Sequence, residues 1–156
     1  IADINAQRME QAVAEISSAT GADVWSHQID IGDEISILRC VQACAERGPL
    51  RGVVNATFGS TGKRFDDLTA ADFDRTNRLN LTGSFILARE AARHMPDGGA
   101  MVMFDAMYGL VAPKPANYPD PMVPDPIDHG AANPASVAMA GYLPGHFGPG
   151  GTRPNA

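Results

Sequence analysis

Residues 69–104 read TAADFDRTNRLNLTGSFILAREAARHMPDGGAMVMF, and this stretch decides the fold class. Thr69, with Asp72 three residues later, resembles a capping box and predicts a long helix from about Ala70 to Met95. The letters PDGG then signal a turn. The run Ala100–Phe104 that follows is continuously apolar, which is typical of a strand buried on both faces. A long helix followed at once by such a strand predicts a helix packed on a parallel sheet.

The same alternation of strand and helix extends toward the N-terminus. Short strands are expected at residues 1–4, 24–31 and 52–55. A helix capped by Asn5 separates the first two strands, and a helix capped by Asp33 separates the second from the third. The order β-α-β-α-β-α-β predicts an α/β fold, a Rossmann-like doubly wound parallel sheet with helices on both faces.

The chain changes character after residue 111. Ten of its twelve prolines lie from Pro113 onward, and residues 112–133 form a Pro-rich loop that we expect to lack regular structure. Residues 134–156 are expected to hold a short helix, broken at Pro144, and the start of a further strand. We therefore expect one partial Rossmann-like domain over residues 1–156, with its core β/α units in residues 1–111.

Composition excludes several classes of protein. The 156 residues carry a net charge of −6, so no basic surface predicts binding to nucleic acid or to anionic lipid. No apolar run approaches the roughly 18 residues that a membrane span needs. Cys40 and Cys44 are too few for a disulfide framework and favour a reduced, cytoplasmic setting. The first residue is Ile1 and not Met, so we do not expect it to be a natural start.

Ligands of open parallel sheets bind beyond the carboxyl ends of the strands, where Asp3, Asp30, Asn55 and Asp105 are expected. Asp3 can accept hydrogen bonds from adenosine ribose hydroxyls and would repel a 2′-phosphate, which favours NAD over NADP. Alternatively, it only complements the dipole of the next helix. Asp30 is either an adenine contact or a helix cap. Asn55 begins a small-residue loop that either lets the backbone approach a nucleotide or forms an ordinary turn.

Asn80 is an anomaly, because asparagine in the middle of a helix is unfavourable and nearby Gly83 adds to the cost. We expect its side chain to bond buried backbone or water, or to support a helix bend. No two histidines have the spacing of metal ligands, so no metal site is predicted. The four histidines are interpreted as structural or solvated: His27, His94, His129 and His146.

Seven segments in order resemble the short-chain dehydrogenase/reductase family in its NAD-type form. They are IADIN, IDIGDE, GVVNATFG, LNLTGSFILAREAARHM, GGAMVMFDAMYGLVAP, NPAS and FGPGGTRPNA. The resemblance implies a Rossmann fold and an NAD(H)-dependent oxidoreductase that acts on an alcohol or ketone. It also implies a homo-oligomer, a dimer or tetramer, because long helices commonly form the subunit interfaces of this family.

The resemblance further implies roles for individual residues. Asp3 and Ile4 would contact the adenosine ribose, and Asp30 and Ile31 would contact adenine. Asn55 and Ala56 fall in the family's Asn-Asn-Ala-Gly segment, with only one of its asparagines present. Asn80 matches the helix asparagine that holds a catalytic water in a proton relay.

Departures from the family affect its chemistry. Its first strand and Gly-rich phosphate loop are expected before Ile1, and its last strand beyond Ala156. Alignment on MYGLVAP and NPAS places the catalytic Ser, Tyr and Lys positions at Ala106, Val137 and Gly141. None of these can donate a proton to a carbonyl oxygen, and the chain contains no Tyr-x-x-x-Lys motif.

Three interpretations stay open at this point. The sequence can be an incomplete version of a genuine NAD-dependent oxidoreductase, impaired as written. It can belong to a catalytically inactive pseudoenzyme that serves as a binding or scaffolding subunit. It can also be a truncated product that folds poorly or only with help.

Overall fold

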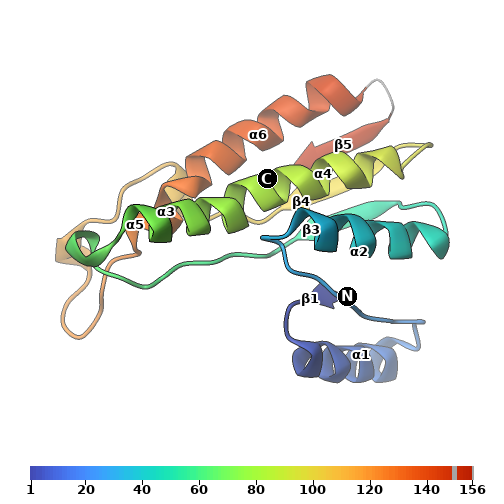
Figure 1. Ribbon diagram of the computed structural model, residues 1–156, viewed down its shortest axis with the longest axis horizontal. Helices are drawn as coiled ribbons and strands as arrows, with labels where there is room; N and C mark the ends of the chain where they lie inside the picture. The colour runs from blue at the N-terminus through green and yellow to red at the C-terminus, as the bar shows by residue number, and fades with distance from the viewer. Residues whose placement is uncertain (149–150, 156) are drawn as a thin grey trace.

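The computed structural model describes residues 1–148 and 151–155 (Figure 1). Helices and strands alternate as predicted. The elements are β1 (Ala2–Asp3), α1 (Ala6–Thr20), β2 (His27–Gln28), α2 (Glu34–Glu46), β3 (Gly52–Asn55), the 3-10 turn η1 (Phe65–Asp67), α3 (Ala70–Asn77), the π-helical turn η2 (Arg78–Thr82), α4 (Gly83–Arg93), β4 (Gly99–Met103), the 3-10 turns η3 (Met107–Gly109) and η4 (Pro115–Asn117), α5 (Ile127–Gly130), α6 (Ala132–Phe147) and β5 (Thr152–Asn155).

The strands form two parallel sheets. β1 pairs with β2, and the second sheet has the order β3-β4-β5. Within the described residues no strand joins β1 to β3. The start of a further strand near the C-terminus is confirmed, since β5 pairs with β4. Parallel strands that alternate with helices confirm the α/β class.

Local sequence explains where the helices begin. The Asn5 side chain accepts a hydrogen bond from the Arg8 amide at 3.0 Å, and Asp33 caps α2 in the same way. Thr69 and Asp72 form both halves of the capping box that opens α3. These three caps satisfy backbone amides that would otherwise lack partners, and each was expected from the sequence.

The predicted helix from Ala70 to Met95 is present as α3, η2 and α4, which run on in one line (Figure 1). The π-helical turn in its middle contains Asn80. Directly after it, a Cβ on Gly83 would lie 2.2 Å from the carbonyl oxygen of Ile31. Glycine is therefore required where this helix passes the chain that leaves β2.

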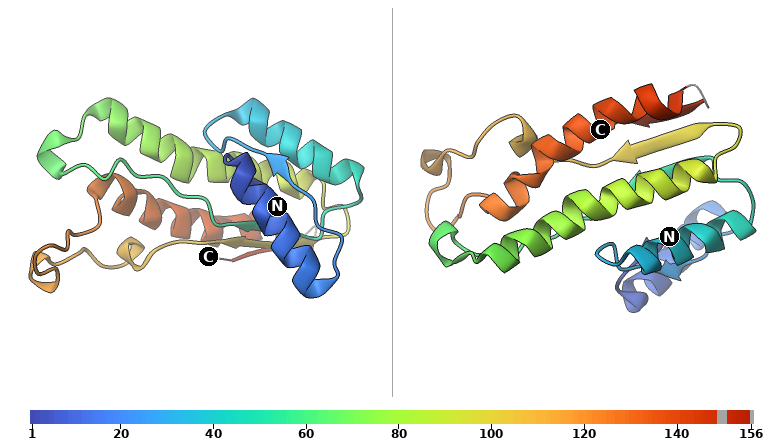
Figure 2. Two further views of the ribbon diagram at one scale, coloured as in Figure 1. Left: turned by 90° about the horizontal axis from the view of Figure 1, so that it is seen from below. Right: turned by 45° about the horizontal axis from the view of Figure 1, so that its top comes forward.

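Two hydrophobic clusters form the core, and α4 contributes to both. One lies between α4, β4 and α6 and contains Ala88, Ala91, Met95, Met101, Met103 and Leu143. The other lies between α4, α2 and the end of β2 and contains Ile29, Ile37, Cys40, Val41 and Ile86. Figure 2 shows α2, α4 and α6 side by side, whereas α1 lies apart from them, beside β1 and β2. No helix in the described part of the chain is long and apolar enough to cross a membrane.

Three expectations about these elements were wrong. The strand expected at residues 24–31 is reduced to His27–Gln28, because β1 is its only partner and is equally short. The Pro-rich loop contains η4 and α5. Proline stands at the first position of η4 and directly before α5, where its missing N–H costs no helical hydrogen bond.

The third wrong expectation concerns the last helix. α6 is not short, and it continues through Pro144 to Phe147. Its residues Ala140 and Leu143 are buried in the core, whereas Pro144 is exposed in the last turns of the helix. Packing of the preceding turns thus outweighs the single backbone hydrogen bond that proline removes.

Candidate active site

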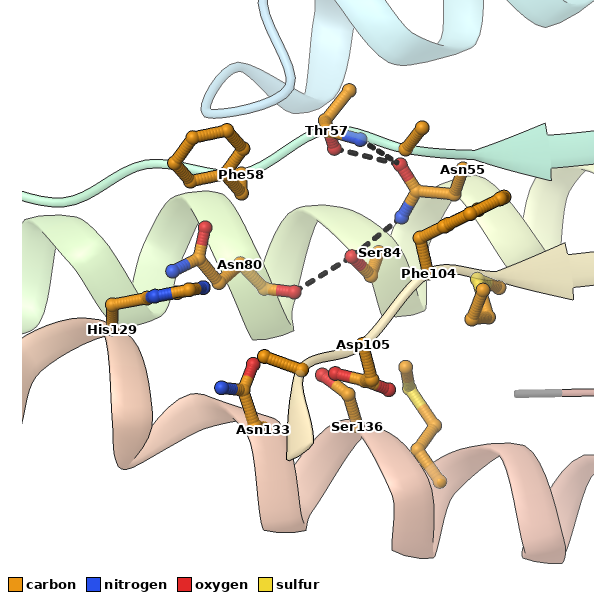
Figure 3. A pocket seen from close by; sticks show the side chains of 14 residues that line it. Asn55, Thr57, Phe58, Asn80, Ser84, Phe104, Asp105, His129, Asn133 and Ser136 are labelled. Carbon is orange, nitrogen blue, oxygen red and sulfur yellow. Dashed lines mark hydrogen bonds between the residues drawn. The ribbon is translucent and has the colours of Figure 1, made fainter. Parts of the chain in front are cut away.

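The carboxyl ends of β3 and β4 open into a cavity of about 270 Å³, here called the inner cavity (Figure 3). The loops after the two strands form one side of it, and η2, α4, α5 and α6 form the rest. Its lining residues are Asn55, Ala56, Thr57, Phe58, Asn80, Ser84, Met103, Phe104, Asp105, Ala106, His129, Asn133, Ser136 and Met139. The cavity lies where a parallel sheet is expected to bind its ligand.

Hydrogen bonds fix the end of β3 to the long helix. The buried Asn55 amide donates to the Ser84 hydroxyl at 2.7 Å, and Ser84 donates to the backbone carbonyl of Asn80 at 2.7 Å. The Asn55 carbonyl oxygen accepts from both the amide and the hydroxyl of Thr57. Asn55 therefore holds the following loop in place as well as the helix.

The Asn80 side chain bonds the backbone of Gly59 in both directions. Its carbonyl oxygen accepts from the Gly59 amide at 2.6 Å, and its amide donates to the Gly59 carbonyl at 2.8 Å. This confirms the expectation that Asn80 bonds backbone, and it offsets the unfavourable placement of asparagine inside a helix. Asn80 thereby joins the π-helical turn to the loop after β3.

His129 enters the inner cavity from α5, and Asn80 and Asn133 line the same cavity from η2 and α6 (Figure 3). Its Nδ1 lies 3.0 Å from the Asp125 carboxylate, and both side chains are largely buried. The Phe58 ring lies 5.5 Å from the imidazole, centroid to centroid. The imidazole thus contacts a carboxylate at one edge and an aromatic ring beside it.

Two polar atoms of the inner cavity are buried and have no hydrogen-bond partner among the described residues: Oδ2 of Asp105 and Nδ2 of Asn133. Burial raises the pKa of Asp105, and the charge of His129 opposes that rise. Unpartnered buried polar atoms are rare in folded proteins because leaving them unbonded is costly. A polar ligand can bond both atoms.

A buried carboxylate anchors α5 to the loop after β3 and to α3. Asp128 is fully buried and accepts hydrogen bonds from the Thr61 amide at 2.8 Å and from the hydroxyls of Ser60, Thr61 and Thr76. Burial alone would raise the pKa of Asp128, but the hydrogen bonds from Thr61, Thr76 and Ser60 outweigh it and lower that pKa. Asp128 is next to His129 and so fixes its position.

A second cavity, here called the outer cavity, lies at the carboxyl ends of β1 and β2 and measures about 420 Å³. Of the residues predicted to contact the adenosine, it contains Asp3, Ile4, Asp30 and Ile31. The other predicted site residues, Asn55, Ala56 and Asn80, line the inner cavity. Thr57 and Phe58 line both cavities, so the two are neighbours.

The three positions that the alignment gives to the catalytic Ser, Tyr and Lys differ in whether they reach the inner cavity. Ala106 lines the inner cavity as expected, but Val137 and Gly141 do not. Val137 is 37% exposed, and a Cβ on Gly141 would meet nothing within 4 Å. The residues four apart that do reach the cavity from this part of the chain are His129 and Asn133.

The interpretation of His129 as a structural or solvated residue stays a prediction, but the structure places its ring in the inner cavity. Asp125, His129 and Asn133 are spaced at i, i+4 and i+8, which predicts one face of a helix. That spacing was the available signal. The expectation that prolines leave residues 112–133 without regular structure concealed it.

Parallel strands, flanking helices and cavities at the carboxyl ends of the strands define a Rossmann-type α/β protein. A family model described as enoyl-(acyl carrier protein) reductase matches residues 1–156. The chain belongs to the short-chain dehydrogenase/reductase family.

Individual relatives agree with this assignment. Versicolorin reductase stcU of Emericella nidulans is 34% identical over 95 residues, which are 60% of this chain and 36% of the relative. A short-chain dehydrogenase from Burkholderia cenocepacia, solved in complex with NADP, has a TM-score of 0.83 and 26% identity over 96% of this chain and 58% of its own. An NAD⁺-bound xylitol dehydrogenase has a TM-score of 0.86 and 23% identity over 99% of this chain and 57% of its own, a likeness of fold alone. The chain thus spans about a third to somewhat over half of these relatives.

Proposed function

We propose that this chain is part of a nicotinamide-dependent oxidoreductase that interconverts an alcohol and a ketone. The observation that carries the proposal is the pair of adjoining cavities, which share Thr57 and Phe58. An extended dinucleotide can occupy the outer cavity with its adenosine and reach the inner cavity with its nicotinamide. When bound, the nicotinamide supplies or accepts a hydride.

The outer cavity fits an adenosine. Asp3 and Asp30 place carboxylates after two neighbouring strands, where they can accept hydrogen bonds from ribose hydroxyls and from the adenine amine. Ile4 and Ile31 supply apolar surface beside them. We propose NAD as the preferred cofactor, because the Asp3 carboxylate would repel the 2′-phosphate of NADP.

In the inner cavity we assign Asn55 and Ala56 to the nicotinamide side of the cofactor and Asn80 to the proton relay. The Asn80 side chain already hydrogen-bonds the backbone of Gly59. The backbone carbonyl of Asn80 accepts a hydrogen bond from the Ser84 hydroxyl. A carbonyl oxygen has two lone pairs. We therefore assign the backbone carbonyl oxygen of Asn80 to holding the relay water, as the family resemblance implies for this asparagine.

Cofactor titration tests the proposal. NADH and NADPH are titrated into the purified protein, with dihydronicotinamide fluorescence as the signal. We expect saturable binding with NADH tighter, and we expect Asp3→Asn to weaken NADH binding several-fold and to narrow the preference over NADPH. Asp66→Asn, at an exposed carboxylate far along the chain, is the matched control and is expected to bind as the wild type does. Failure of the wild type to bind either nucleotide would refute the proposal.

A catalytically inactive binding or scaffolding subunit is the second candidate. Ala106 favours this candidate, because it lines the inner cavity at the position where the family resemblance implies a serine hydroxyl. Nucleotide binding without hydride transfer to any ketone would support this candidate. In either case we propose a homo-oligomer, on the family resemblance, and a cytoplasmic setting, on the two cysteines Cys40 and Cys44.

A further inference from the structure

We propose that His129, oriented by Asp125, is the proton-transfer group of the inner cavity, in place of the tyrosine that the family resemblance implies. The inference rests on the proposed function, because it names the residue that completes that reaction. It is carried by the arrangement of Asp125, His129, Asp105 and Asn133 around one cavity.

The tyrosines of the chain are placed elsewhere. Among the described residues that line the inner cavity there is no tyrosine. The hydroxyls of Tyr108 and Tyr118 bond each other, and Tyr142 is 76% exposed on α6. Histidine is the side-chain type whose ordinary pKa lies near neutrality, and among the described residues that line this cavity it is present as His129.

The carboxylate of Asp125 fixes which nitrogen of His129 is free to react. A carboxylate accepts but does not donate, so the Nδ1 atom, 3.0 Å from Asp125, carries a hydrogen. The structure gives Nε2 no hydrogen bond with a described residue. In the neutral imidazole Nε2 then carries a lone pair, and in the imidazolium it carries the transferable proton.

The surroundings of the imidazole suit a reaction that changes its charge. The Asp125 and His129 side chains are only 20% and 17% exposed. Asp125, which precedes α5, and Asp105, after β4, are the carboxylates that face the ring, and both stabilise the imidazolium. The Phe58 ring, from the loop after β3, packs against the imidazole at a tilt of 42°.

Asn133 supplies the complementary contact for a substrate. Its Nδ2 is buried, lines the same cavity and lacks a partner among the described residues. An amide donor of this kind can bind the oxygen of a carbonyl group while Nε2 of His129 approaches the same oxygen. The substrate class is thus a compound with a ketone oxygen, or the corresponding secondary alcohol, small enough for a cavity of about 270 Å³.

In the direction of reduction, a hydride and a proton add to the carbonyl group. A bound reduced nicotinamide, the cofactor class of the proposed function, would supply a hydride with its electron pair to the carbonyl carbon and would itself be oxidised. The Nε2–H bond of the His129 imidazolium breaks, and its proton forms the O–H bond of the product alcohol. Neutral His129 then takes up a proton from water. Oxidation of the alcohol reverses each of these transfers.

The tautomer of His129 tests the geometry without any need for activity. The protein is labelled with ¹⁵N-histidine, and the His129 signals are assigned by their loss in His129→Gln. We expect the proton of the neutral ring on Nδ1 in the wild type and a shift toward Nε2 in Asp125→Ala. His27 and His94 serve as internal references that Asp125→Ala leaves unchanged. A wild-type spectrum with the proton on Nε2 would overturn the proposal.

Kinetics then test the role. Oxidation of NADH is followed with cyclohexanone and with acetophenone, and NADH binding is titrated separately. We expect His129→Gln to lose about 10²- to 10⁴-fold in kcat with NADH binding unchanged, and His129→Tyr to recover part of that loss. Wild-type turnover in His129→Gln would overturn the role of His129. Absence of NADH binding in the wild type would instead overturn the proposed function. The tautomer spectra would still test whether Asp125 holds the proton of His129 on Nδ1.

Discussion

Among single residues, the Asp128 carboxylate stands out because it accepts hydrogen bonds from three others, Ser60, Thr61 and Thr76. It is fully buried, and its hydrogen bonds join α5 to the loop after β3 and to α3. We expect Asp128→Asn to lower the free energy of unfolding by about 3 kcal/mol, because an amide cannot accept all of these donors and leaves some of them unbonded. Urea denaturation measures the change, with Asp66→Asn as the control, expected within about 0.5 kcal/mol of wild type.

The same carboxylate predicts a dependence on pH. Since the folded state lowers the pKa of Asp128, its stabilising contribution is complete above the ordinary carboxyl value of about 4 and is lost as the pH falls through the lower folded value. The difference in unfolding free energy between wild type and Asp128→Asn should therefore shrink below about pH 4. A difference that stayed constant from pH 7 to pH 3 would contradict this account.

At the scale of elements, the long helix depends on Gly83. A Cβ there would meet the Ile31 carbonyl at 2.2 Å, whereas a Cβ on Gly141, also inside a helix, would meet nothing within 4 Å. We expect Gly83→Ala to destabilise the protein by about 1–3 kcal/mol. The matched Gly141→Ala variant should stabilise it by about 0.5–1 kcal/mol. Denaturation midpoints of the two variants are compared, and equal shifts in the same direction would count against the close approach.

How far the sequence predicted each element depended on the range of the interactions involved. The caps at Asn5, Asp33 and Thr69 were predictable because each satisfies amides within three residues of itself. Asn80 was conspicuous because its residue type conflicts with its place in a helix. His129 was not predicted, because its position depends on Asp128 reaching Thr61, 67 residues earlier in the chain. No local pattern encodes that contact.

At the scale of the whole molecule, the part formed by β1, α1 and β2 is held less firmly than the rest. Met9 is the buried residue of α1, whereas α4 places Ala88 and Ala91 in one hydrophobic cluster and Ile86 in the other. Regions with few buried apolar contacts open at lower free energy. We expect amides of residues 6–20 to exchange with deuterium well before those of residues 83–93. Mass spectrometry of peptides from the two helices measures this, and equal protection would show that the protein opens as one unit.

Thr57 and Phe58 are the wall that the two cavities share. For an engineer this shared wall couples two properties that are usually tuned separately. A larger or smaller residue at position 58 changes the ring contact with His129 and, at the same time, the lining of the outer cavity. Substrate range and nucleotide affinity should then change together in libraries at this position, whereas substitutions at Ser136 or Met139 reshape the inner cavity alone.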